Sequence, residues 1–135
     1  MLLGKKKRYH SDGGIVHSIL GSETSFRGTI DTQESIRIEG SFEGQINSQG
    51  EVYIGEGSVV KANIYARRVV VSGEVNGSVE AINGLEITST GRVYGDITGD
   101  RLIIDEGAVY KGNVSMDVIT SKRSYEEEKL GKQGR

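Results

Sequence analysis

The chain contains no cysteine, no proline and no tryptophan among its 135 residues, and aromatic residues make up only 6%. Without cysteine, neither a disulfide framework nor a thiolate metal site can form. Hydrophobic residues amount to 35%, which predicts a thin core rather than a thick globular one. No stretch approaches the roughly 18 apolar residues of a transmembrane helix, and no apolar signal-peptide region follows the N-terminal charges. We therefore expect a cytoplasmic chain unless something tethers it.

Basic residues are scarce in the middle of the chain. The net charge is −2, but residues 1–10 carry four basic residues and no acidic one. Residues 121–135 carry five basic and three acidic residues, so the segment between them has a charge of −2 − 4 − 2 = −8. A nucleic-acid groove needs basic side chains along the phosphate backbone. An acidic body therefore argues against nucleic acid as a partner of the main part of the chain.

Glycine is abundant, with 20 residues, and an internal repeat accompanies it. Apolar residues recur in four columns at steps of roughly 16–17 residues, a period that indicates a solenoid. The first column is Ile36, Val52, Val69, Leu85 and Leu102, and the second is Ile38, Ile54, Val71, Ile87 and Ile104. The third is Phe42, Val59, Val75, Val93 and Val109, and the fourth is Ile46, Ile64, Val79, Ile97 and Val114. Upstream, Leu20, Phe26 and Ile30 stand 16 residues before Ile36, Phe42 and Ile46.

Local alternation with a period of two, together with β-branched residues, predicts that each repeat consists of short strands. One rung of 16–17 residues cannot bury its own apolar side, whereas stacked rungs can. The chain is therefore predicted to form an all-β, right-handed, three-sided β-helix of about six rungs spaced roughly 4.8 Å apart. Gly40 and Gly44 are expected near corners. The left-handed hexapeptide β-helix is the structural rival, but a spacing of 16–17 fits a multiple of six poorly.

Residues with catalytic chemistry are few and scattered. His10 and His17 both precede the repeats, and neither has a partner at the spacing of a metal site or a catalytic triad. Asp105 and Glu106 are interpreted as a solvated corner rather than a catalytic pair. We expect no catalytic residues, no metal and no cofactor, and therefore no enzyme.

The ordered set of rungs, ending in "GDI" at 95–97 and "DEGAVYKGNVSM" at 105–116, resembles the bactofilins, a family of bacterial cytoskeletal proteins. The resemblance covers roughly residues 18–118. It implies end-to-end assembly, without nucleotide, into non-polar filaments on the inner face of the cytoplasmic membrane. It also implies a scaffold that positions partner proteins such as cell-wall or morphogenesis enzymes. The alternative is a monomeric β-solenoid that binds a protein or carbohydrate on one face.

Three segments follow from this interpretation: a flexible tail at 1–17, the β-helix at 18–120 and a charged flexible tail at 121–135. The start "MLLGKKKR" combines an apolar tip with basic residues and is predicted to bind anionic membrane lipid. The predicted membrane-binding residues are Met1, Leu2, Leu3, Lys5, Lys6, Lys7 and Arg8. The predicted polymerisation residues are Ile19, Leu20, Phe26 and Ile30 at one end and Tyr110, Val114, Met116 and Val118 at the other.

Side-chain directions can also be predicted, because alternate residues of a strand point to opposite faces. The second apolar column should face inward. The residues between the first two columns should face outward: Arg37, Tyr53, Val70, Glu86 and Ile103. Tyr53, Val70 and Ile103 would then form an outward stripe, and Tyr94 and Tyr110, with Val60 near them, a second one. Such a stripe serves filament bundling or partner docking, unless it is ordinary surface.

Overall fold

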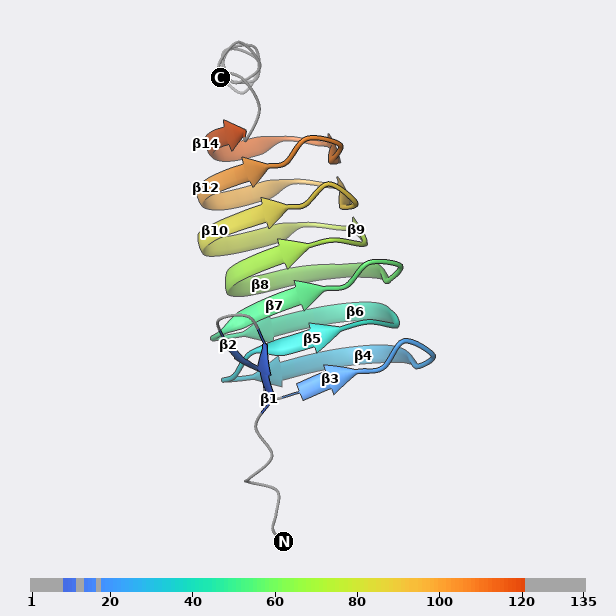
Figure 1. The fold of residues 1–135 in the computed structure, drawn as a ribbon. Helices are drawn as coiled ribbons and strands as arrows, with labels where there is room; N and C mark the ends of the chain where they lie inside the picture. Colours follow the sequence, from blue (N-terminus) through green and yellow to red (C-terminus); the bar gives the residue numbers. More distant parts are fainter. Residues whose placement is uncertain (1–8, 12–13, 17, 121–135) are drawn as a thin grey trace, which may run out of the picture.

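Short strands joined by tight corners wind into a single coil. The computed structural model describes residues 9–11, 14–16 and 18–120, with side chains over 18–115. Twelve strands form one sheet in which all pairings are parallel, and the coil climbs as a right-handed solenoid of about six turns (Figure 1). The solenoid strands are β3 (Ser18–Leu20), β4 (Ser25–Thr32), β5 (Ile36–Ile38), β6 (Ser41–Ser48), β7 (Glu51–Ile54), β8 (Val59–Val71), β9 (Glu74–Asn76), β10 (Val79–Ile87), β11 (Arg92–Tyr94), β12 (Ile97–Ile104), β13 (Val109–Lys111) and β14 (Val114–Thr120).

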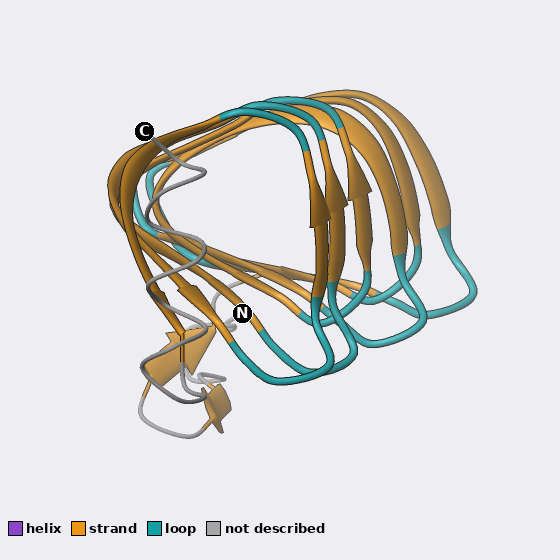
Figure 2. Ribbon diagram, turned by 90° about the horizontal axis from the view of Figure 1, so that it is seen from above, coloured by secondary structure: helices purple, strands orange, loops and turns teal. Residues whose placement is uncertain are grey.

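The coil has three sides, visible in the view along its axis (Figure 2). Face A consists of segments 18–20, 36–38, 51–54, 68–71, 84–87, 101–104 and 117–120. Face B consists of segments 25–28, 41–44, 59–62, 74–76, 92–94 and 109–111. Face C consists of segments 29–32, 45–48, 63–66, 79–81, 97–99 and 114–115. Longer strands such as β8 and β10 pass around a corner and contribute to more than one face.

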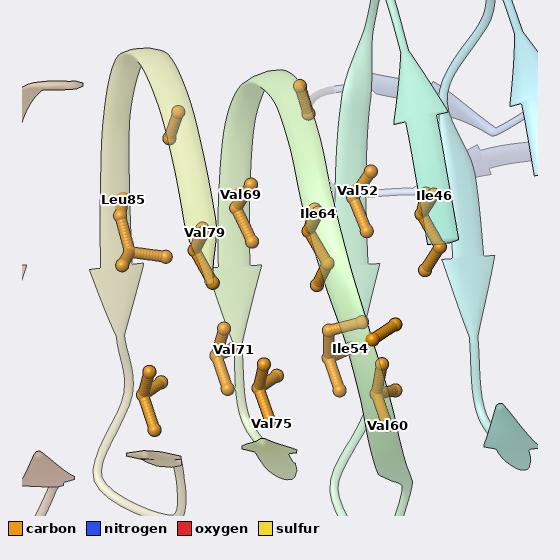
Figure 3. Close-up of a cluster of buried hydrophobic side chains, with 14 of the residues drawn as sticks. Ile46, Val52, Ile54, Val60, Ile64, Val69, Val71, Val75, Val79 and Leu85 are labelled. Carbon is orange, nitrogen blue, oxygen red and sulfur yellow. The ribbon is translucent and has the colours of Figure 1, made fainter. Parts of the chain in front are cut away.

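The core is a narrow stack of aliphatic side chains inside the coil. Ile38, Val71 and Ile87 are 0% exposed, and Ile54 is 1% exposed. Figure 3 shows the inward side chains repeating from rung to rung, as the first, second and fourth apolar columns predict. Fully burying each such side chain contributes roughly 1.5–3 kcal/mol. The core therefore stabilises the stack of rungs and cannot form within a single rung.

The predicted alternation on face A is confirmed. The column Arg37, Tyr53, Val70, Glu86 and Ile103 is in register across the rungs. Each of these residues is partly exposed, whereas their neighbours in the inward columns are buried, apart from Ile104 near the end of the rod. The fold class is therefore the one that the repeats predicted.

The third predicted column is wrong at two positions. On face B it is Val60, not Val59, that occupies the core, at 0% exposed. Similarly Tyr110, not Val109, is in register with Val93, the inward valine of the rung before it. Val109 is 37% exposed. The predicted outward stripe of Tyr94, Tyr110 and Val60 is wrong for the same reason, because two of its members point inward.

A β-turn at some of the corners between faces A and B explains these shifts. The backbone N–H of Ser58 donates to the carbonyl of Gly55 at 3.0 Å, and that of Ala108 to the carbonyl of Asp105 at 3.1 Å. Each turn lengthens its corner relative to rungs that lack it. The first valine after the turn therefore still points outward, and the next residue enters the core.

The first rung contains the same kind of turn, closed by the N–H of Thr24 on the carbonyl of Gly21 at 3.0 Å. As a result Leu20 is in register with Ile38, whereas its spacing in the sequence predicted Ile36. The pairing of strand β4 with β6 is as expected, with eight consecutive residues in register from Ser25 to Thr32.

Gly40 and Gly44 lie at corners, as expected. Gly44 has φ +139°, and a Cβ on Gly40 would lie 2.2 Å from the carbonyl oxygen of Thr24. Outside the solenoid, β1 (Tyr9–Ser11) and β2 (Gly14–Val16) form a separate antiparallel pair. No helix in residues 9–11, 14–16 and 18–120 is long and apolar enough to cross a bilayer.

Candidate functional site: the two ends and the lateral faces

Each end of the solenoid has strands that pair on one side only. Strands β3 and β4 pair with β5 and β6 of the next rung, and β13 and β14 pair with β11 and β12 of the rung before. Their outer edges therefore present backbone N–H and C=O groups that have no strand beside them in the described chain. Such edges invite pairing with another chain.

The N-terminal end carries apolar side chains that are only half covered. Phe26 is 37% exposed, and its ring stacks on Phe42 of the next rung with a centroid distance of 5.2 Å. Leu20 and Ile30 are partly buried and pack against the core. Ile19, predicted together with them, lies instead in the outward column of face A and is 52% exposed.

The C-terminal end also carries apolar side chains that are only partly covered. Tyr110 and Val114 are partly buried and pack against the core cluster. Met116 and Val118 lie on β14, but their side chains are outside the described residues. Sequence reasoning missed Ile104 and Ala108, which also border this end and pack against the core.

Tyr110 differs from the valines that precede it in its column, because it brings a hydroxyl into an apolar setting. Its Oη atom is buried and has no hydrogen-bond partner among the described residues. Burial, and secondarily the negative charge of Asp96, raise the pKa of Tyr110 to about 12. The side chain is therefore neutral at physiological pH and packs as an aromatic core residue.

The predicted membrane-binding residues all lie in segment 1–8, outside the described residues. The described chain carries the acidic part of the molecule, and its charges differ from face to face. On face B, Arg27 pairs with Glu43 at 3.5 Å and Arg92 with Glu74 at 3.2 Å. The hydrogen bond from Asn76, and secondarily that from Arg92, lower the pKa of Glu74. These pairs are exposed and contribute little to stability.

Surface hollows on the rod are shallow. A groove of about 470 Å³ crosses the first rungs of face B and includes Phe26 and Phe42 in its lining. Within the described residues, no group of three or more His, Cys, Asp or Glu side chains is placed to hold a metal ion. Asp105 and Glu106, the acidic pair singled out in the sequence, begin the β-turn at the last corner between faces A and B.

Comparison with known proteins places the repeat region in one family. The family model described as "Bactofilin: Polymer-forming cytoskeletal" matches residues 18–115. Bactofilin BacO of Myxococcus xanthus is 34% identical over 104 residues, which are 77% of this chain and 82% of the relative. Bactofilin BacP of the same organism is 30% identical over 117 residues, which are 87% of this chain and 49% of the relative.

A solved structure shares the fold. It is a cryo-EM reconstruction of Thermus thermophilus bactofilin double helical filaments, which matches with a TM-score of 0.66 and 26% sequence identity. The match covers 73% of this chain and 99% of that chain.

Proposed function

The chain belongs to the bactofilins, the polymer-forming cytoskeletal family, and from this premise we propose that its rods join end to end into filaments without nucleotide. The filaments would be non-polar, with like ends meeting, and would lie in the cytoplasm on the inner face of the membrane. There they would act as a scaffold for partner proteins such as cell-wall or morphogenesis enzymes.

The observation that carries the proposal is the contrast between the middle and the ends of the rod. Inward side chains of the middle rungs are 0–6% exposed, but Phe26 at the first rung is 37% exposed. Docking a second rod on either end would cover such side chains and pair the open strand edges; where like ends meet, the facing strands would run antiparallel. The polar caps that keep other solenoids monomeric are not present among residues 18–115.

We further propose that segment 1–8 is the membrane anchor. Four basic residues near an anionic leaflet contribute about 4 kcal/mol, at about 1 kcal/mol each. Ordering a flexible tail opposes binding by roughly 1 kcal/mol or more per residue fixed. One tail is therefore a weak anchor, whereas a filament presents many tails in a row and binds by avidity.

Val114→Asp is expected to abolish long filaments, because it places a carboxylate among apolar groups at the C-terminal end. Sedimentation and electron microscopy measure the result. If like ends meet, the intact N-terminal ends still join and the variant is a dimer; head-to-tail stacking would leave a monomer of 14.6 kDa. Ser115→Asp is the matched control, because this exposed neighbour points outward on the same strand. Filaments of normal length from Val114→Asp would exclude this end from the contact.

Deleting residues 2–8 is expected to release filaments from vesicles that contain anionic lipid without shortening them. The reason is that the deletion removes every basic residue of segment 1–10 and leaves the rod ends intact. Co-sedimentation with vesicles measures binding, and electron microscopy measures filament length. Neutral vesicles provide the control. Undiminished co-sedimentation of the truncated filaments with anionic vesicles would refute the anchor.

A further inference from the structure

We propose that face A is a lateral contact at which a second copy of this rod, belonging to a neighbouring filament, docks across a two-fold axis. The proposal rests on the end-to-end assembly proposed above and adds the surface by which two filaments pair. In a two-fold contact the same surface of both copies meets itself. Each face can therefore be judged by whether it is complementary to itself.

Face C is unsuited to such a contact. Its outward positions carry Asp31 and Glu80, together with amide, hydroxyl and phenol side chains, and no lysine or arginine. Docked on itself, this face would bring carboxylates together with no compensating cation. Like charges opposed across a contact are destabilising and exclude partners.

Face B has the opposite imbalance. Its outward basic residues are Arg27, Lys61, Arg92 and Lys111, and its outward acidic residues are Glu43 and Glu74. Both glutamates pair with an arginine of the same face. The net charge of +4 − 2 = +2 comes from the two lysines. A copy of the same face would therefore be repelled.

Face A combines apolar outward residues with balanced charges, because Arg37, Arg68 and Arg101 are matched by Glu51, Glu86 and the corner residue Glu39. Along its outward column Ile19 is 52% exposed, and Tyr53, Val70 and Ile103 are partly exposed. Two of its three cations have ion-pair partners at the face. The first is Arg37, which pairs with the corner residue Glu39 and lies 5.6 Å from the ring centre of Tyr53.

A second ion pair lies toward the other end of the same face, where Arg68 contacts Glu86 at 3.4 Å. Because cations and carboxylates alternate along face A, a copy docked across a two-fold axis finds opposite charges beside an apolar strip. This is the combination of apolar centre and charged rim typical of protein interfaces.

The size of face A explains why pairing would require filaments. Strands of three or four residues at about 3.3 Å each, over about six rungs at roughly 4.8 Å, give a strip of about 300–400 Å². A stable complex buries about 800 Å² on each partner. Single rods should therefore not pair, whereas rods joined in a row pair through repeated weak contacts. The double helical filaments of the Thermus thermophilus relative are consistent with a lateral contact in this fold.

The test compares two aspartates placed on different faces. Val70→Asp puts a carboxylate at the centre of face A, next to Glu86 of the following rung. Val59→Asp on face B is the matched control, because Val59 is also a partly exposed valine with a glutamate, Glu74, in register on the following rung. Cryo-electron microscopy counts single and paired filaments, and circular dichroism confirms that each variant is folded.

We expect paired filaments from the unmodified chain and from Val59→Asp, and single filaments of unchanged length from Val70→Asp. Tyr53→Ser is a second, uncharged variant on face A and is expected to lower the paired fraction at least several-fold. Paired filaments that persist in both Val70→Asp and Tyr53→Ser would overturn the proposal, as would only single filaments from the unmodified chain. An unmodified chain that forms no filaments at all would instead overturn the proposed function.

Discussion

Gly95→Ala is expected to lower the free energy of unfolding of the rod by roughly 4 kcal/mol. Gly95 has φ +149°, which only glycine adopts readily, and holding another residue there costs about 1–3 kcal/mol. In addition, a Cβ at this position would lie 2.0 Å from the carbonyl oxygen of Gly77 on the rung below. Moving a packed rung to relieve this overlap costs about 1–3 kcal/mol more. Thermal melting followed by circular dichroism measures the loss.

Gly57→Ala is the control that separates backbone strain from steric overlap. Gly57 also has a positive φ, +91°, but an added Cβ there would meet nothing within 4 Å. This variant should lose only the strain energy, about 1–3 kcal/mol. Equal losses for Gly95→Ala and Gly57→Ala would show that the close stacking of rungs at Gly95 does not limit stability.

Val71→Asp is expected to prevent the rod from folding. Val71 is 0% exposed and lies between Ile54 and Ile87 in the inward column of face A. An unpaired charge buried there costs several kcal/mol, which is comparable to the 5–15 kcal/mol that stabilises a typical domain. The yield of folded protein and its far-ultraviolet circular dichroism measure the effect.

Val70→Asp, one residue away, should leave the fold intact because its side chain points outward. The same substitution thus serves as the control for Val71→Asp and as the probe of lateral pairing. Comparable loss of folded protein at both positions would place the inward column one residue out of register, because a shift of one residue exchanges the two sides of a strand.

The ends, the faces and the tails have separate roles in this interpretation of the molecule. In the proposed assembly, the ends would determine length, face A would determine pairing, and segment 1–8 would attach the filaments to lipid. Face C, with carboxylates and no lysine or arginine at its outward positions, would be repelled by an anionic bilayer. Filaments that lie on such a membrane should therefore turn this face toward the cytoplasm, where partner proteins have access to it.

The sequence alone was sufficient to predict the solenoid, its rungs and most of its core. The steps between columns such as Ile38, Ile54 and Val71 follow from stacking, because each rung must present its apolar side chains directly over those of the rung below. Alternation within a strand then assigned Val70 and Arg37 to the outside. The same spacing of apolar residues is needed in every rung. The repeat can therefore be recognised in a single sequence.

The tertiary structure alone decided which residue enters the core after a corner. Alternation operates within a strand, but a β-turn interrupts it, and the residues around Gly55 do not reveal how many positions the turn uses. Hydrogen bonding between rungs fixed that number and placed Val60 and Tyr110 inside, where the sequence had suggested Val59 and Val109. The charge of each face could likewise be counted only from the structure. Residues adjacent in the sequence point in opposite directions, and the length of each corner decides which of them face outward.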